Sequence, residues 1–227
     1  QQKMLAAFIE NGVSESHFTA STGYGYGDRG RETLDRVLSQ VFGTEDALIR
    51  HNFTCGTHTL AVALFGILRP GDTMLCVTGA PYDTIRPVIG ITGKSGNGSL
   101  KDFGIRYAQV ELDGQGRVDL PAVEAALRAD PTVRMVYIQR SRGYSLRPSL
   151  SPQEIGQIAA IVHRCSDAVV MVDNCYGEFV CEEEPTQCGA DLIAGSLIKN
   201  PGGGIAPTGG YIAGRHDLIE LCAQRMT

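Results

Sequence analysis

The chain has 227 residues, of which 43% are hydrophobic and 20% charged, and its formal net charge is -5. This composition is typical of a globular protein and excludes a disordered or fibrous chain, while the length suits one large α/β domain because two full domains would be tight. The acidic balance gives no electrostatic footprint for nucleic acid or an anionic membrane, so we expect a small molecule or another protein as partner.

The seven cysteines form an odd-numbered set without a C-x-x-C pair. This pattern argues against a disulfide framework and a zinc site, and it favours a reducing compartment. The apolar runs are too short to span a membrane, and the first residues lack the charged and apolar regions of a signal peptide. We therefore expect a cytoplasmic protein. Residues 216–227 have the pattern of a helix that is cut short, so the chain is interpreted as a fragment.

Short β-rich runs alternate along the chain with longer runs of helical period, which is the pattern of βα units and a mostly parallel sheet. Helices are expected at residues 5–10, 30–43, 57–71, 120–130 and 151–165. Strands are expected at residues 47–53, 73–79, 105–112, 133–140, 168–174, 192–198 and 209–214. The predicted fold class is therefore α/β, with a mostly parallel seven-stranded sheet flanked by helices.

Two of the expected helices have clear ends. The helix at 30–43 places four apolar residues on one predicted core face: Leu34, Val37, Leu38 and Val41. It closes on Gly43, because glycine is a usual stop for a helix. The helix at 151–165 begins with Ser151 as its cap and Pro152 in its first turn, and Glu154 completes a capping box.

Two glycine-rich runs resemble nucleotide-binding motifs. Residues 25–30 match G-x-G-x-x-G, but that motif works only directly after a strand, and residues 14–22 make a poor strand. Residues 91–98 resemble a phosphate loop, but Val88 stands where the motif needs its first glycine, so this interpretation is rejected. A nucleotide-binding protein remains a rival interpretation through the first run. The five histidines are too scattered in sequence to predict a metal site.

Polar features follow the carboxyl ends of predicted strands, where open parallel sheets bind their ligands. Gly56 and Thr57 lie at a strand-to-helix junction, whose free N–H groups suit a phosphate, although this junction taken alone favours Thr57 as a plain helix cap. Tyr82 follows the next strand, where its ring could cover a flat ligand or simply belong to a turn.

Asp173 and Lys199 end two further strands. A carboxylate at the end of a buried strand is costly unless a cation pairs with it, and a protonated pyridine nitrogen is such a cation. Neighbouring strand ends would bring the Asp173 carboxylate and the Lys199 amine to opposite sides of one small molecule. Pyridoxal phosphate needs a lysine, an acid at its ring nitrogen, a phosphate cup and a stacked aromatic ring. For Lys199 alone, a cation that reaches solvent from a strand end is the alternative.

Several segments resemble the fold-type I pyridoxal-phosphate enzymes of cysteine and methionine metabolism, and most closely the methionine gamma-lyase or aluminium resistance protein family. The matching segments are residues 24–35, 55–72, 81–84, 138–144, 172–180 and 189–215. The resemblance implies the large domain of a pyridoxal-phosphate-dependent transferase-like fold, with the C-terminal small domain absent. It also implies pyridoxal 5'-phosphate as cofactor.

Six residues take roles by this resemblance. They are Lys199 as the catalytic lysine that binds the cofactor through a Schiff base, Asp173 at the ring nitrogen, Tyr82 stacked on the ring, and Gly56, Thr57 and Ser196 in the phosphate cup. In related lyases a tyrosine-containing loop near the N-terminus reaches the neighbouring subunit's cofactor phosphate. Residues 24–31 look like that loop, so Tyr24, Tyr26 or Arg29 is expected to serve there, in a homodimer or homotetramer with shared active sites.

The expected domain division follows. Residues 1–30 would form an N-terminal helix and intersubunit loop, and residues 31–227 the cofactor-binding large domain, truncated at its C-terminal end.

Some residues depart from the pattern of the family. Related lyases carry a hydroxyl residue where Ile198 stands and a serine where Cys55 stands. Gln139 or Arg142 would replace an asparagine near the cofactor's ring hydroxyl. The arginine that grips the substrate carboxylate would lie beyond the chain end.

The expected function is that of a pyridoxal-phosphate-dependent carbon-sulfur lyase acting on a small sulfur amino acid, in the manner of a methionine gamma-lyase or a cystathionine beta-lyase. The sequence does not choose between β and γ elimination. An aminotransferase or aldolase on the same fold is the first alternative. A fold that binds the cofactor without catalysis, as a regulatory or interaction module, is the second.

Overall fold

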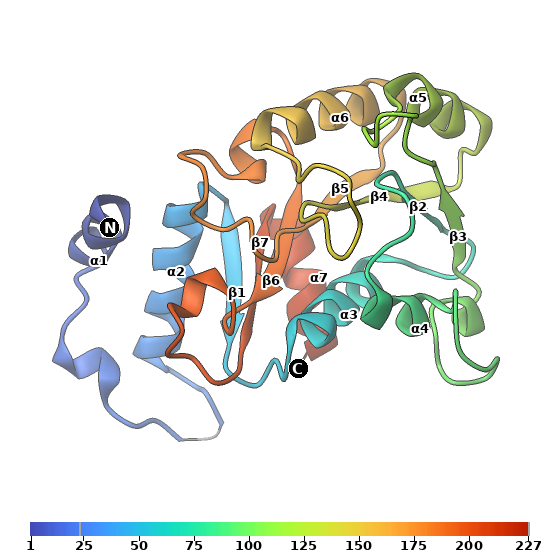
Figure 1. Ribbon diagram of the computed structural model, residues 1–227. Coiled ribbons are helices and arrows are strands. Elements are labelled where there is room, and N and C mark those ends of the chain that lie inside the picture. Colours follow the sequence, from blue (N-terminus) through green and yellow to red (C-terminus); the bar gives the residue numbers. More distant parts are fainter. Residues whose placement is uncertain (23, 227) are drawn as a thin grey trace.

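The computed structural model describes residues 1–22 and 24–226, and within them seven strands form one sheet in the order β1-β7-β6-β5-β4-β2-β3 (Figure 1). The strands are β1 Asp46–Arg50, β2 Thr73–Cys76, β3 Arg106–Gln109, β4 Val133–Gln139, β5 Val169–Asp173, β6 Leu192–Ser196 and β7 Gly210–Gly214. Strands β2 to β6 pair in parallel, and β7 runs antiparallel to its neighbours β1 and β6. The predicted mostly parallel seven-stranded sheet is confirmed.

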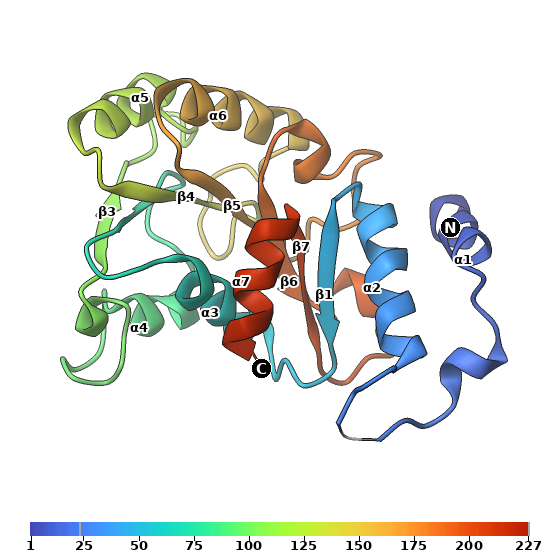
Figure 2. The same cartoon turned by 180° about the vertical axis from the view of Figure 1, so that it is seen from behind.

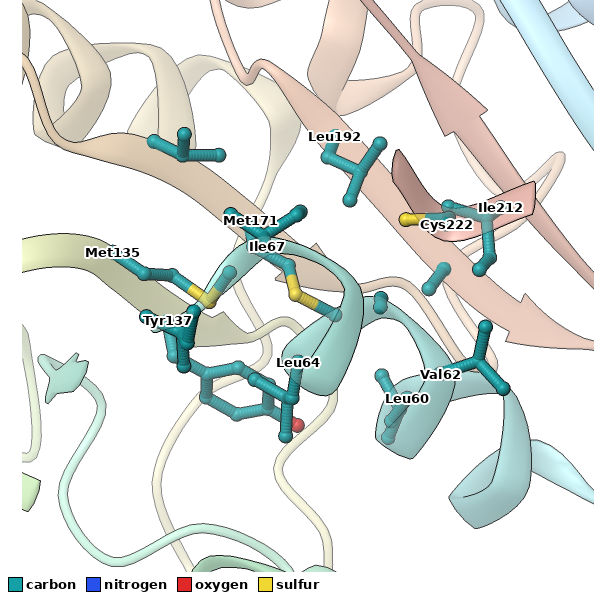
Figure 3. Close-up of a cluster of buried hydrophobic side chains, with 14 of the residues drawn as sticks. Leu60, Val62, Leu64, Ile67, Met135, Tyr137, Met171, Leu192, Ile212 and Cys222 are labelled. Carbon is teal, nitrogen blue, oxygen red and sulfur yellow. The ribbon is translucent and has the colours of Figure 1, made fainter. Parts of the chain in front are cut away.

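Helices cover both faces of this sheet (Figures 1 and 2). They are α1 Gln2–Glu10, α2 Arg29–Phe42, α3 Gly56–Ile67, α4 Arg86–Ile89, α5 Leu120–Ala129, α6 Pro152–Cys165 and α7 His216–Met226. Buried side chains of α3 and α7 form one core with the sheet, and those of α2, α5 and α6 form another. Figure 3 shows side chains of this first core, among them Leu60 and Leu64 of α3 and Met135, Tyr137 and Met171 of the sheet. We call these two sides the α3 face and the α2 face.

The predicted ends of α2 and α6 agree with the structure, but one predicted core residue does not. The Ser151 amide donates to Glu154 over 2.8 Å and the Glu154 amide donates to the Ser151 hydroxyl over 3.2 Å, which is the predicted capping box. Helix α2 ends before Gly43, whose φ of 64° favours glycine. The prediction for Leu34 was wrong. Leu34 is 41% exposed, because α2 turns Thr33 toward the core instead.

Strand alternation decides what each side chain of β5 and β6 faces. Met171 packs in the core of the α3 face, so Asp173, two residues further along β5, belongs to the same face. Ile193 packs in the core of the α2 face, and Gly195 lies on that side too. The carboxyl ends of the parallel strands share one edge of the sheet, and there Gln139, Asp173 and Ala194 lie in register.

Helix α1 packs on α2 at the edge of the molecule (Figure 1), where Ala7 meets Val37 and Val41. Residues 15–18 form a single 3-10 turn between the two helices, so the described part of residues 14–22 holds no strand before α2. The division of the chain at residue 30 stays a prediction. Among the helices described by the structure, none has the length and apolarity to cross a membrane.

Candidate functional site

A cavity of about 500 Å³ lies at the shared carboxyl edge of the parallel strands. Five of the six predicted site residues line it: Gly56, Thr57, Tyr82, Asp173 and Lys199. Its wall also contains Cys55, Thr84, Ser141, Arg142, Tyr144, Cys175, Tyr176 and Ile198. The strand ends therefore bring the predicted carboxylate and amine to the same cavity.

Asp173 forms the acidic part of the cavity wall and is 6% exposed. Its carboxylate accepts hydrogen bonds from the Tyr137 hydroxyl over 3.3 Å and from the Cys175 amide over 3.1 Å. Burial raises the pKa of Asp173, while these hydrogen bonds and the charge of Lys199 oppose that rise. Such a carboxylate suits a ligand that presents a protonated ring nitrogen, because a cation beside it compensates the cost of burial.

Lys199 follows β6, is half-buried and lines the same cavity. Its ammonium group donates a hydrogen bond to the hydroxyl of Tyr176. Its backbone is fixed by a hydrogen bond from its own amide to the Ser196 carbonyl over 3.2 Å. The amine therefore lies at the cavity wall beside Tyr176, and its role there stays a prediction.

Tyr82 is held on the cavity wall by its backbone and by its hydroxyl. Its amide donates to the side-chain oxygen of Gln139 over 2.6 Å, and its hydroxyl donates to that of Tyr144 over 3.1 Å. The hydrogen bond with Tyr144 is the main cause that raises the pKa of Tyr82 to about 12. Gln139 also donates to the Ser141 carbonyl, so both ends of its amide are engaged. Of the two predicted replacements for asparagine, only Arg142 lines the cavity.

The N-terminus of α3 opens onto the cavity without a side-chain cap. Cys55 is the N-cap residue and makes no capping hydrogen bond. The Thr57 hydroxyl lies 2.7 Å from that of Thr84, so the interpretation of Thr57 as a plain cap is wrong. Free amides, the positive end of the helix dipole and two hydroxyl groups make this corner suited to a phosphate.

Ser196 lies just behind this corner rather than on the cavity wall. Its side chain is fully buried, and its hydroxyl donates to the Gly209 carbonyl over 3.4 Å and accepts from the Ile198 amide over 3.3 Å. A Cβ atom placed on Gly56 would lie 3.4 Å from the Ser196 Cβ, so the two residues are in contact range. The role of Ser196 in a phosphate cup stays a prediction.

The N-terminal loop stays outside the cavity of its own chain. Tyr24 and Tyr26 are 84% and 91% exposed, and neither lines the cavity, while Arg29 is the first residue of α2. Two cavity tyrosines, Tyr144 and Tyr176, were not among the predicted site residues. The sequence signals for them were their position in loops that follow strands and their place in the segments 138–144 and 172–180, which resemble the family.

The donor set as a whole fits pyridoxal 5'-phosphate. It offers an amine, a buried carboxylate, an aromatic ring and an anion-binding helix end around one cavity of about 500 Å³. Lys199, Asp173 and Tyr82 would contact the ring and its aldehyde, and Gly56 and Thr57 the phosphate.

Comparison with known proteins agrees with this geometry. The chain is 50% identical over 226 residues to the uncharacterized protein YnbB of Bacillus subtilis (strain 168), covering 99% of this chain and 53% of that protein. A carbon-sulfur lyase involved in aluminium resistance from Clostridium novyi NT is 55% identical with a TM-score of 0.96, covering 100% of this chain and 54% of that one. The chain thus spans about half the length of these relatives.

A more distant structure shows the fold. The pyridoxal-5'-phosphate dependent protein YhfS from Escherichia coli is 17% identical with a TM-score of 0.75, covering 98% of this chain and 56% of that one. The predicted fold, the large domain of fold-type I pyridoxal-phosphate proteins, is therefore confirmed. The model of the methionine gamma-lyase family matches residues 1–227. With the whole chain matched, this protein belongs to the methionine gamma-lyase family.

Proposed function

We propose that the chain is the cofactor-binding part of a pyridoxal-phosphate-dependent carbon-sulfur lyase that acts on sulfur amino acids. The observation that supports this proposal best is the shared cavity, in which the amine of Lys199 and the buried carboxylate of Asp173 line one space of about 500 Å³. Membership in the methionine gamma-lyase family and the carbon-sulfur lyase from Clostridium novyi NT point to the same chemistry.

Each residue would have a separate task. When bound, the cofactor supplies an electron sink for charge that develops at the substrate's α carbon. Asp173 would hold a proton at the ring nitrogen, because its buried carboxylate gains a cationic partner there. Tyr82 would cover the ring, and the amides of Gly56 and Thr57 would hold the phosphate. Lys199 would carry the cofactor at rest and move the α proton once its amine is free.

We also propose a homo-oligomer in the cytoplasm. The exposed Tyr24 and Tyr26 do not line the cavity of about 500 Å³ in their own chain, which fits a loop that serves the site of a neighbouring subunit. The seven cysteines are all free thiols, which fits a reducing compartment.

The first test of this function is chemical trapping at Lys199. Full-length protein loaded with pyridoxal 5'-phosphate is reduced with borohydride, and the modified peptide is identified by mass spectrometry. We expect the modification on Lys199. The Lys199→Ala variant should lose the visible absorption and at least about a thousandfold in turnover, while Lys94→Ala, altered in an exposed loop, should keep both. A cofactor trapped on any other lysine would contradict the assignment.

The second test separates the lyase from its alternatives. Incubation with methionine or cystathionine should yield a 2-oxo acid together with a thiol, and the preferred substrate identifies γ or β elimination. A 2-oxo acid without a thiol would indicate an aminotransferase instead. A protein that binds the cofactor but turns over no amino acid would be the non-catalytic module.

A further inference from the structure

The loop at residues 174–179, here called the site loop, connects Asp173 to the outer part of the molecule in a strained conformation. Tyr176 has a φ of 69° and Phe179 a φ of 62°, and they are the two non-glycine residues of the described chain with positive φ. Side chains with a Cβ rarely adopt this region, and such residues persist where the surroundings fix them. Phe179 has a packing reason, because its ring stacks on Phe42 at 5.6 Å. Tyr176 is 59% exposed, so core packing does not explain it.

Buried polar side chains on the α2 face hold the site loop in place. Five residues, each no more than 3% exposed, form this buried polar cluster: Arg140, Asn174, Glu178, Glu184 and Tyr211. Arg140 donates to the Asn174 side-chain oxygen over 2.7 Å and to Glu184 over 3.2 Å. Glu184 also accepts from the Phe179 amide over 2.8 Å. The cluster therefore holds both ends of the site loop.

The middle of the site loop is tied to the lysine segment. The Asn200 side-chain amide donates to the Tyr176 carbonyl over 3.2 Å and to the Glu178 carbonyl over 2.9 Å. Asn200 follows Lys199 directly in the chain. Asn200 thus joins the backbone of the site loop, at Tyr176, to the chain segment that carries Lys199.

We propose that Tyr176 is a further catalytic residue, whose hydroxyl holds the free amine of Lys199 in the cavity, and that Asn200 is the positioning residue for this pair. The inference rests on the proposed function. A protonated lysine offers three donors and no acceptor, so a fixed hydroxyl oxygen directs one N–H bond and leaves the others for the cavity. The proton stays on Nζ in this contact, and no bond forms or breaks. Strain in the site loop is the structural cost of placing that hydroxyl.

The decisive experiment uses full-length protein free of cofactor and compares the wild type with Tyr176→Phe. Acetylation by N-hydroxysuccinimide acetate at pH 7 is followed by mass spectrometry at Lys199, with the exposed Lys94 as internal reference. The hydrogen bond to the Tyr176 hydroxyl holds Nζ in place and hinders its attack on the reagent, so the variant should label Lys199 about fivefold faster or more. The Tyr144→Phe variant, which removes another cavity hydroxyl that bonds Tyr82 instead, should label at the wild-type rate. Equal rates in Tyr176→Phe and wild type overturn the proposal.

Turnover provides the second measurement. In the loaded enzyme, Tyr176→Phe should lower kcat about tenfold or more with little change in KM, while borohydride still traps the cofactor on Lys199. An unchanged kcat overturns the catalytic role. Asn200→Ala should also accelerate the labelling of Lys199, but by less than Tyr176→Phe does. Because labelling needs neither cofactor nor substrate, it decides the role of Tyr176 even if the protein proves not to be a lyase.

A second variant tests the role of Tyr176 if Tyr176→Phe does not fold. Thermal melting of each variant shows whether it folds. If Tyr176→Phe does not fold, Tyr176→Asn takes its place, since asparagine adopts positive φ readily and lacks the phenol. Faster labelling of Lys199 in the folded Tyr176→Asn variant supports the proposal, and the wild-type rate contradicts it.

Discussion

Glu178 and Asp173 carry two buried carboxyl groups near the same edge of the sheet, on opposite faces. Burial raises the pKa of both, and for Glu178 the pKa reaches about 7, with the charges of Asp173 and Glu184 adding to the rise. Asp173 faces the cavity, where a ligand can supply the missing positive charge. Glu178 accepts from the Tyr211 hydroxyl over 2.9 Å, and its second oxygen has no hydrogen-bond partner among the described residues.

The state of Glu178 predicts how stability depends on pH. Its folded pKa of about 7 lies above the ordinary value of 4.5. The folded state therefore carries no penalty below pH 4.5, and the penalty grows as the pH rises from 4.5 to about 7. Above that range it amounts to about 3 kcal/mol. Glu178→Gln removes this contribution, because the amide does not ionise.

Urea unfolding at pH 5 and pH 8 measures the effect in full-length protein. We expect the wild type to lose more stability than Glu178→Gln between the two pH values. At pH 8 the variant should be the more stable protein. Identical losses in both proteins would show that Glu178 ionises normally in the fold, and Glu10→Gln, altered at an exposed carboxyl group, is the matched control.

At the scale of elements, sequence reasoning found what depends on local pattern. Every predicted strand exists, because short apolar runs bounded by turn residues indicate strands without reference to the rest of the chain. The start of α6 was also predictable, since Ser151 and Glu154 lie within one helical turn. The exposure of Leu34 was not, because it depends on how α2 rotates against the sheet and against α1.

Sequence reasoning about the site found most of the residues that the strand ends bring to the cavity and missed those that hold the site loop. Lys199 and Asp173 could be predicted because parallel strands end at one edge. The left-handed conformation of Tyr176 could not, because the contacts that hold the site loop come from other segments, with Arg140 bonded to Asn174 and Asn200 bonded to the Tyr176 carbonyl. Local preference disfavours that conformation, so no local pattern indicates it.

Strand β6 offers a test of the contact between the sheet and the buried polar cluster. A Cβ atom on Gly195 would lie 2.6 Å from both the Glu178 carboxylate and the Tyr211 hydroxyl. Gly195→Ala should therefore destabilise the protein by about 1–3 kcal/mol, as overpacked cores do. Gly114→Ala, at a position with no atom within 4 Å, is the control and should change stability by less than about 0.5 kcal/mol. Equal melting temperatures for the two variants would show that the side chains of the buried polar cluster move aside at little cost in stability.

At the scale of the whole molecule, the proposed assembly with shared sites makes a quantitative prediction. A variant with Tyr24, Tyr26 and Arg29 all replaced by alanine should lose activity in the full-length enzyme, and so should Lys199→Ala. Mixed and re-associated, the two should recover about a quarter of wild-type activity, because half of the dimers are hybrids and each hybrid has one intact site. Activity no higher than that of the separate variants would show that each site is built from one chain.

The position of β7 has a consequence for how the molecule comes together during synthesis. Strand β1 pairs with β7, and β7 pairs with β6, so the earliest strand is joined to the sheet by the latest one. A nascent chain that has left the ribosome only as far as residue 209 would contain every residue of the cavity and yet leave β1 without a neighbour. The next five residues, Gly210–Gly214, provide both the strand with which β1 pairs and the Tyr211 hydroxyl that bonds Glu178 of the site loop.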